Sequence, residues 1–395
     1  MHLFISAADS ATELQSELEQ SFTSATVSSA GPMLLQADFE ISLGQHLPYL
    51  AFSRQWLPNA QPLQAESIRA WATELLNHVV GILPDDQPWL LHIEPLYGGQ
   101  PIHRMGARAW HSAQRTQNAA RGPRNFSKEI LRGSSDQSLE GADQSQSRPE
   151  AEAGRHRCHL IRENLVEMLQ KKRRHLLRQL QRQPVHFTAN ASLVQLLLTS
   201  PEAGFISVAP APIPFEERHL LSPFPGGSVA MASDKAAPSR AFAKLVEAEQ
   251  RLNRTIKPGE TCVDLGASPG SWTYVAVSRG ARVISVDRSP LREDLMLHPH
   301  VKFQPGDAFR FQPSRPVDWL LCDVIAVPER TAELLLNWLQ RRWCRHFVVT
   351  VKLKDIPGAD VLAMLKRELP LLTSELFLTR LCANKKEICA FGVVK

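Results

Sequence analysis

Apolar runs and polar segments follow one another most regularly in the last 160 residues of the chain. Short apolar runs at 261–265, 282–286, 319–322 and 346–351 are each followed by a polar turn or by a stretch with helical spacing. Runs of this length without alternation are typical of strands buried on both faces of a parallel sheet. The pattern therefore predicts a doubly wound, Rossmann-like α/β domain over 236–395.

The first part of the chain, 1–110, shows patterns typical of helices and of strands. Trp71, Leu75, Leu76 and Val79 recur at helical spacing, whereas 89–93 reads as a buried strand. The mixture predicts an α+β module. Further strands are expected at 3–5, 32–36 and 51–53, and a further helix at 11–22.

Hydrophobic residues become scarce between 111 and 157. The only large apolar residues there are Phe126, Ile130, Leu131 and Leu139. Such a stretch buries too little apolar surface to offset its chain entropy. We therefore expect 111–157 to be a disordered insertion.

A basic helix is expected after the insertion, at 160–182 within the segment 158–209. From 158 to 183 the chain carries seven lysines or arginines and two glutamates. The net charge of this short stretch is therefore +5, the same as that of the whole chain. A single basic stripe is what a phosphate backbone requires, although a solvated helix face gives the same pattern. The candidate RNA-binding residues are Lys171, Lys172, Arg173, Arg174, Arg178 and Arg182.

The rest of the segment 158–209 leads to the C-terminal domain. Strands are expected at 185–187 and 205–209, with a short helix at 192–198 between them. Five prolines then fall within sixteen residues, which predicts a linker over 210–235. The 395 residues thus divide into about two or three domains.

The clearest chemical signal is the turn that follows the strand at 261–265. Gly266 and Gly270 permit close backbone approach, and the helix that begins after them offers free N–H groups to a carboxylate or phosphate. Asp287 ends the next strand, where a carboxylate can accept ribose hydroxyls, and Asp307 is placed to bind an adenine edge.

The same turn disfavours a dinucleotide. Ser268 replaces the second glycine of the G-x-G-x-x-G pattern, and Pro269 lacks an N–H that a pyrophosphate would use. S-adenosyl-L-methionine carries a carboxylate and an adenosine but no pyrophosphate. It is therefore the expected cofactor.

Residues 264–272, Asp-Leu-Gly-Ala-Ser-Pro-Gly-Ser-Trp, resemble the nucleotide loop of FtsJ-like RNA ribose 2′-O-methyltransferases. Residues 238–248 resemble the segment just before that loop in the family. By this resemblance Ser239, Asp264, Gly266, Ser268, Pro269, Gly270, Ser271, Asp287, Asp307 and Asp323 would contact S-adenosyl-L-methionine. Ser271 stands where the family usually has glycine.

A narrower resemblance is to the bacterial ribosomal RNA large subunit methyltransferase M group. It implies methylation of a cytidine ribose in 23S rRNA and an N-terminal RNA-binding half of the THUMP type, with a ferredoxin-like part. Ser268 stands where this group has cysteine. The resemblance rests on 319–328, 337–339, 343–345 and 351–353, and more weakly on 47–56.

The family's Lys-Asp-Lys-Glu tetrad corresponds here to Lys244, Asp323, Lys352 and Glu387. Asp323 and Lys352 end neighbouring strands, where doubly wound folds assemble their sites. A ribose hydroxyl must lose its proton as it attacks, and Lys352 can accept that proton only when neutral, which burial or the Lys244 cation would favour. Each residue alone has an ordinary reading, such as a helix cap or a surface ion pair.

Three other functions compete with ribose methylation. A non-catalytic RNA-binding protein would keep the fold but would not need the tetrad. A base methyltransferase would need an Asn-Pro-Pro-Tyr-like loop, which is absent after the strand at 319–322, and Cys322 is expected to pack inside that strand. A nicotinamide oxidoreductase is disfavoured by the turn at 266–271.

The cysteine pattern and the hydropathy argue against a metal site and against a membrane span. None of the six cysteines forms a CxxC pair, and His156, Cys158 and His159 lack a second half at ligand spacing, so no metal site is expected. No apolar run approaches the roughly 20 residues that span a bilayer. We expect a cytoplasmic monomer that acts on ribosomal RNA of the large subunit.

Overall fold

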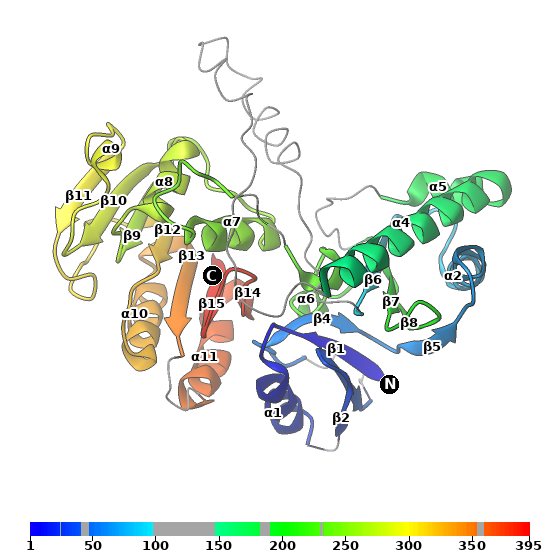
Figure 1. Ribbon diagram of the computed structural model, residues 1–395. Helices are drawn as coiled ribbons and strands as arrows, with labels where there is room; N and C mark the ends of the chain where they lie inside the picture. The colour runs from blue at the N-terminus through cyan, green and yellow to red at the C-terminus, as the bar shows by residue number, and fades with distance from the viewer. Residues whose placement is uncertain are drawn as a thin grey trace, which may run out of the picture.

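The residues described by the computed structural model form three β-sheets, one in the C-terminal domain and two in the N-terminal half (Figure 1). The structure describes residues 1–23, 25–40, 47–97, 147–181, 190–229, 231, 233–353 and 359–395.

The first sheet is antiparallel, with strand order β2-β3-β1-β4, and one helix, α1, packs on it. Its apolar residues Phe4, Leu14 and Leu35 share one buried cluster. The mixture of helix and strand predicted for this part is confirmed. The elements are β1 (His2–Ser6), α1 (Ala11–Ser21), β2 (Thr26–Gly31), β3 (Leu34–Asp38) and β4 (Ser53–Leu57).

The second sheet has the order β5-β8-β7-β6, in which only β6 and β7 are parallel. Helices α2 and α4 contribute Trp71, Leu75, Ile161 and Leu165 to its apolar core. The elements are β5 (Gln61–Gln64), α2 (Ile68–Ile82), β6 (Trp89–Pro95), α4 (Ser147–Lys172), α5 (Arg174–Gln179), β7 (Ser192–Leu198) and β8 (Ala203–Ala209).

The prediction of a helix at 192–198 is wrong, because this segment is strand β7. All seven of its residues are buried, and it pairs with β6 on one side and β8 on the other. A short continuous apolar run has no period that separates a strand from a helix turn.

Helix α4 corrects the predicted limit of the insertion. It begins at Ser147, so 147–157 are helical rather than disordered, and Cys158 is buried against the second sheet. The basic helix is also interrupted, since α4 ends at Lys172 and α5 begins at Arg174. Residues 111–146, the strand predicted at 185–187 and Arg182 lie outside the described residues.

The C-terminal sheet has the order β11-β10-β9-β12-β13-β15-β14, with β15 antiparallel to both neighbours and the other strands parallel. The predicted doubly wound domain is confirmed. Strand order reverses between β9 and β12, so the carboxyl ends of these strands form the usual binding crevice.

The strands of this sheet are β9 (Thr261–Leu265), β10 (Arg282–Asp287), β11 (Val301–Pro305), β12 (Val317–Cys322), β13 (Cys344–Lys352), β14 (Thr373–Thr379) and β15 (Glu387–Val394). Its helices are α7 (Phe242–Arg251), α8 (Ser271–Ser278), α9 (Glu293–Met296), α10 (Pro328–Gln340) and α11 (Ala359–Leu372).

The proline-rich segment between the two halves packs against both of them. It contains α6 (Phe215–Arg218) and the 3-10 turn η1 (Pro225–Gly227), and Leu220 and Leu221 are buried. The Trp56 N–H donates to the Leu220 carbonyl at 3.0 Å, and Val229 N–H donates to Cys382 Sγ at 3.2 Å. This segment is therefore structured, rather than a loose linker.

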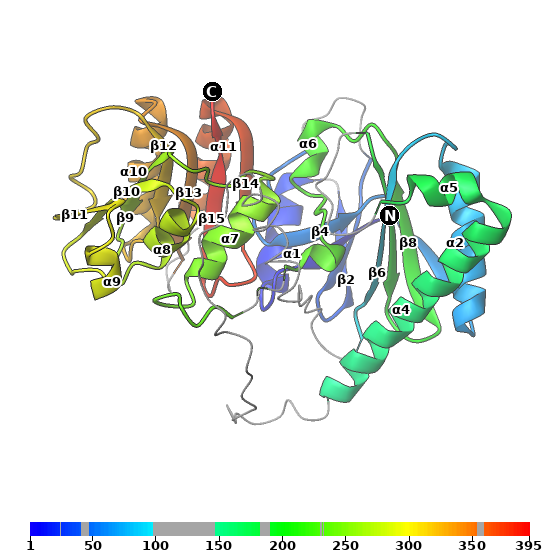
Figure 2. The same ribbon diagram turned by 90° about the horizontal axis from the view of Figure 1, so that it is seen from above.

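The two halves also contact each other directly and lie beside one another in two views (Figures 1 and 2). The Arg380 N–H donates to the Ala51 carbonyl at 2.8 Å, and Lys366 Nζ lies 2.5 Å from Glu17 Oε1. These contacts fix the position of the N-terminal half beside β14 and α11. Within the described ranges, no helix combines the length and hydropathy of a membrane span.

Candidate active site

The turn between β9 and α8 lies at the reversal of strand order. Gly266 has φ of 75°, and a Cβ there would come within 2.9 Å of Val324 Cα, just after β12. Gly270 has φ of 108°, and its Cβ would meet Leu295 Cδ1 at 2.4 Å. Both glycines are therefore required for the turn to lie this close to its neighbours.

Asp287 holds this turn against the end of β10. Its two carboxylate oxygens accept the N–H groups of Ser268 at 3.0 Å and Ser289 at 2.9 Å. Ser268 Oγ donates to the Pro290 carbonyl at 2.9 Å, and Pro269 is the next residue of the turn. The structure thus brings Asp287 and the turn together, as predicted, and gives Asp287 a positioning contact that the sequence did not indicate.

The start of α8 contacts the segment that precedes α7. Ser239 Oγ and Ser271 Oγ share a hydrogen bond of 2.7 Å, so two residues predicted to contact the cofactor are adjacent. Tyr274 Oη donates to Asp234 Oδ2 at 2.9 Å. Sequence reasoning missed Asp234 and Tyr274, because no motif links a residue of the proline-rich segment to α8.

Asp264 lies inside the domain, which does not fit its predicted direct contact with the cofactor. Its carboxylate is buried and accepts from Thr273 Oγ1 at 2.7 Å. Burial raises the pKa of Asp264 to about 7, and the hydrogen bonds from Thr273 only partly oppose this effect. The hydrogen bond between Asp264 and Thr273 therefore connects β9 to α8 and helps to hold the turn between them in place.

We predict that Asp264→Asn reduces the loss of stability as pH rises. A carboxyl group whose pKa is 3.8 in the unfolded chain and about 7 in the folded one stabilises the fold below pH 3.8, and this contribution disappears as pH rises through 7. We expect the free energy of unfolding, measured with urea between pH 5 and 7, to decrease with pH less steeply in the variant than in the wild type. The difference between the two slopes should be about 1 kcal/mol per pH unit. A variant with the wild-type slope would contradict the prediction.

Asp307 follows β11 and has cationic neighbours. Its Oδ2 lies 3.0 Å from Arg288 and 3.6 Å from Arg330, and the Arg330 guanidinium stacks 3.8 Å from the Phe309 ring. The Phe309 N–H and Arg288 together hold the pKa of Asp307 below its usual value. A planar ring system and a charged carboxylate thus lie next to each other at this edge.

The predicted tetrad is assembled as a closed square of alternating charges. Lys244 Nζ lies 3.1 Å from Asp323 Oδ2 and 2.5 Å from Glu387 Oε1. Lys352 Nζ lies 2.5 Å from Asp323 Oδ1 and 2.6 Å from Glu387 Oε2. Lys244 comes from α7, Asp323 follows β12, and Lys352 pairs with Glu387 across β13 and β15.

The tetrad is nearly closed to solvent but not sealed. The side chains of Lys244, Asp323, Lys352 and Glu387 are 9%, 17%, 14% and 7% exposed. Burial lowers the pKa of Lys352, yet Asp323 and Glu387 together raise it above its ordinary value. Although burial alone would raise the pKa of Glu387, its contacts with Lys244 and Lys352 lower it. Both shifts favour the charged forms of Lys352 and Glu387, and the square as a whole holds two lysines and two carboxylates.

Cys322 does not offer a nucleophile beside this site. It is buried in β12, and burial raises the pKa of its thiol to about 12. A thiol with so high a pKa supplies almost no thiolate at neutral pH. In the part of the chain that the structure describes, no cluster of three or more His, Cys, Asp or Glu could hold a metal ion.

The basic residues at the end of α4 and on α5 lie far from the tetrad. In both views α5 lies on the side of the molecule away from β13, with α7 between them (Figures 1 and 2). The structure therefore does not bring this cluster into the active site. All five described members are exposed: Lys171, Lys172, Arg173, Arg174 and Arg178.

Comparison with known proteins agrees with this geometry. Residues 237–374 match the model of the FtsJ-like methyltransferase family. A protein named Ribosomal RNA large subunit methyltransferase M from Laribacter hongkongensis is 40% identical over 176 residues, which cover 43% of this chain and 48% of the relative. The protein of the same name from Halorhodospira halophila is 43% identical over 133 residues, which cover 33% and 39%.

These matches cover less than half the length of either relative. Among solved structures, TrmN from Thermus thermophilus is 13% identical with a TM-score of 0.30 over 100% of this chain and 99% of its own, a likeness too remote to bear on function. The family match covers the turn, the first lysine of the square, Asp323 and Lys352. Residues 237–374 are therefore the part of the chain that is similar to FtsJ-like methyltransferases.

Proposed function

We propose that this protein transfers a methyl group from S-adenosyl-L-methionine to the 2′-oxygen of a ribose in RNA. The observation that carries the proposal is the closed square of Lys244, Asp323, Lys352 and Glu387 beside the glycine turn. The relatives' name supports ribosomal RNA of the large subunit as substrate. The family resemblance further suggests a cytidine of 23S rRNA, and a monomer that acts in the cytoplasm.

The turn and its surroundings fit S-adenosyl-L-methionine. The glycines leave the turn without side chains where a Cβ would already meet Val324 or Leu295. The amino end of α8, with Ser271 and Ser239, suits a carboxylate, while Asp287 keeps unused lone pairs for hydroxyl groups. When bound, this cofactor supplies an electrophilic methyl group.

Lys352 is the proposed general base, and the square controls its protonation. Its raised pKa means that the amine carries a proton in the free protein. Burial is the opposing influence, and an RNA strand that covers the remaining exposed part of the amine would strengthen it. Asp323 and Glu387 hold the amine in place, and the Lys244 cation between the same carboxylates weakens their hold on the Lys352 proton.

Alignment supplies most of the rate enhancement in such a site. The square is built on strand ends and one helix, so its four groups are held rigidly relative to the turn. A hydroxyl fixed in line with the methyl group reacts as an intramolecular partner. The ribose must come from a loop or a single strand, because its 2′-oxygen has to enter this crevice.

The exposed basic residues of α4 and α5 are proposed to contact RNA phosphates at a distance from the reaction. We predict that Lys172→Gln combined with Arg174→Gln and Arg178→Gln weakens RNA binding without changing cofactor affinity. The slope of log K against log salt should fall by about 0.7 per lost contact. Filter binding of a 23S rRNA transcript across a salt series measures the RNA affinity and its salt dependence. An unchanged slope would show that these residues do not contact RNA phosphates.

A methyl-transfer assay tests the proposed function. Labelled S-adenosyl-L-methionine is incubated with the full chain and with rRNA extracted from cells that lack this protein. We expect label in the large-subunit RNA and none in the small-subunit RNA. Cofactor binding without transfer to any RNA would favour the alternative, a non-catalytic RNA-binding protein that keeps the fold.

A further inference from the structure

A buried arginine lies at the junction of the two halves. Arg54, in β4, is 9% exposed. Its side chain donates one long hydrogen bond among the described residues, from Nη1 to Ser228 Oγ at 3.4 Å, and its buried Nε has no partner there. Among the described residues no carboxylate forms an ion pair with it. A buried guanidinium without a counter-charge is costly, which suggests that an anion binds there.

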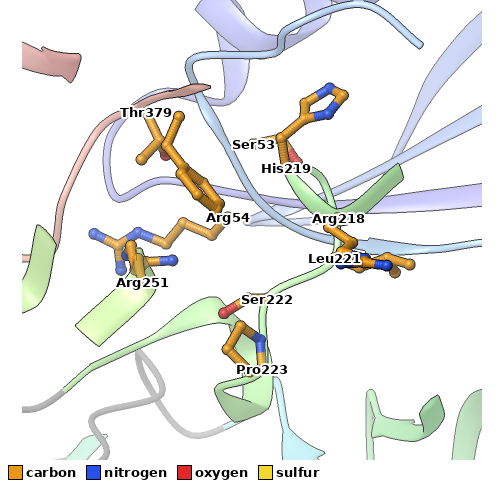
Figure 3. Close-up of a pocket in the computed structure, with 10 residues that line it drawn as sticks. Ser53, Arg54, Arg218, His219, Leu221, Ser222, Pro223, Arg251 and Thr379 are labelled. Carbon is orange, nitrogen blue, oxygen red and sulfur yellow. The ribbon is translucent and has the colours of Figure 1, made fainter. Parts of the chain in front are cut away.

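Arg54 lines a pocket that is formed by all three parts of the chain (Figure 3). We call it the junction pocket. Ser53 and Arg54 come from β4, His219 and Ser222 from the proline-rich segment, and Arg251 and Thr379 from the C-terminal domain. The Arg54 guanidinium extends toward that of Arg251 in the close-up (Figure 3).

The charge of the pocket is positive. Arg251 is balanced, since its guanidinium donates to Glu247 Oε1 at 2.7 and 2.9 Å. Arg54 has no such balance, and a second cation, Arg380, follows Thr379 directly. Burial lowers the pKa of Arg380 and the Arg54 charge lowers it further, whereas the charges of Asp9, Glu13 and Glu387 act in the opposite direction.

The junction pocket adjoins the proposed active site. Glu247, which holds Arg251, lies on α7 three residues after Lys244 of the square. The other oxygen of Glu247 accepts the Cys382 N–H at 2.8 Å, in the connection between β14 and β15 that leads to Glu387. Arg251, which lines the pocket, therefore lies on the same helix as Lys244, about two turns away.

We propose that the junction pocket binds a phosphodiester group of the RNA strand next to the nucleotide that is methylated. This inference rests on the proposed function. A guanidinium fork matches two phosphate oxygens, and its planar shape fixes the direction of the strand. Because residues of both halves form the pocket, the phosphate would set the strand's position relative to the square, and Arg54 would act as a positioning residue.

The test compares Arg54→Gln with Arg345→Gln. Arg345 is 77% exposed, pairs with Asp318 and lies at the amino end of β13, whereas Lys352 lies at its carboxyl end, so Arg345 controls for loss of one positive charge. Binding of a 23S rRNA transcript is measured across a salt series. For Arg54→Gln we expect about tenfold weaker binding and a salt slope reduced by about 0.7, with unchanged affinity for S-adenosylhomocysteine. Arg345→Gln should match the wild type.

A second variant, Thr379→Asp, separates phosphate binding from a structural role. It places a carboxylate in the pocket beside Arg54, so it should raise the melting temperature while weakening RNA binding. Inorganic phosphate alone should raise the melting temperature of the wild type but not of Arg54→Gln. Wild-type RNA binding and salt slope in both variants would overturn the inference, and a response to inorganic phosphate with unchanged RNA binding would assign the pocket to the free ion.

The methyl-transfer assay keeps the two claims apart. If the wild type methylates RNA and Arg54→Gln binds RNA with an unchanged slope, only the junction pocket is excluded. If the wild type methylates no RNA, the proposed function itself fails.

Discussion

Lys352→Ala is expected to abolish methyl transfer to RNA. Removal of a general base costs about two to four orders of magnitude in rate. Asp323 and Glu387 would also lose a cation that lies 2.5 and 2.6 Å from them. Affinities for S-adenosylhomocysteine and for the RNA should change by less than about twofold, because the turn and the basic surfaces remain. Single-turnover transfer measures the chemical step directly.

Lys302→Ala is the matched control, since this lysine is exposed on β11, away from the square. The pH dependence gives a second test of the same role. Because the pKa of Lys352 is raised, the neutral amine is scarce at pH 7, and the transfer rate should increase about tenfold per pH unit below that pKa. A flat profile between pH 7 and 9, or an active Lys352→Ala variant, would exclude Lys352 as the base.

Gly266→Ala is expected to remove most of the cofactor affinity. The residue has φ of 75°, which costs an alanine roughly 1–2 kcal/mol. Its Cβ would also come within 2.9 Å of the Val324 backbone, next to Asp323. The turn must move, and the amino end of α8 moves with it. Calorimetric titration with S-adenosylhomocysteine should show a loss of at least about tenfold.

Gly259→Ala isolates the effect of the clash. Gly259 has φ of 84°, but a Cβ there would meet nothing within 4 Å. This variant carries similar backbone strain without displacing a neighbour, so it should be destabilised and still bind the cofactor normally. Equal loss of affinity in both variants would show that the close approach to Val324 is unimportant.

The square of Lys244, Asp323, Lys352 and Glu387 could be predicted because its members follow from topology and motif together. Asp323 and Lys352 end adjacent parallel strands, and adjacent strand ends meet at one edge of a sheet. Lys244 and Glu387 needed the family resemblance, since a helix residue and the start of an antiparallel strand have no such rule. The alternation of charges around the square is visible only in the structure.

Other features depend on packing that the sequence does not encode locally. Residues 192–198 lack a diagnostic period, so their strand form follows only from burial between β6 and β8. Asp264 is predicted to contact the cofactor, but its carboxylate is buried and accepts a hydrogen bond from Thr273, nine residues later. Arg54 carried no signal of its own, because a buried unpaired guanidinium is recognised only after every neighbour is placed.

The central claim is that the 2′-oxygen of a ribose receives the methyl group. The most direct measurement is alkaline hydrolysis of RNA labelled by the wild-type protein, followed by mapping of the resistant linkage. A 2′-O-methyl group blocks cleavage of the adjacent phosphodiester, so we expect all label in alkali-resistant dinucleotides from one position of large-subunit RNA. Label recovered in mononucleotides with a methylated base would contradict the account.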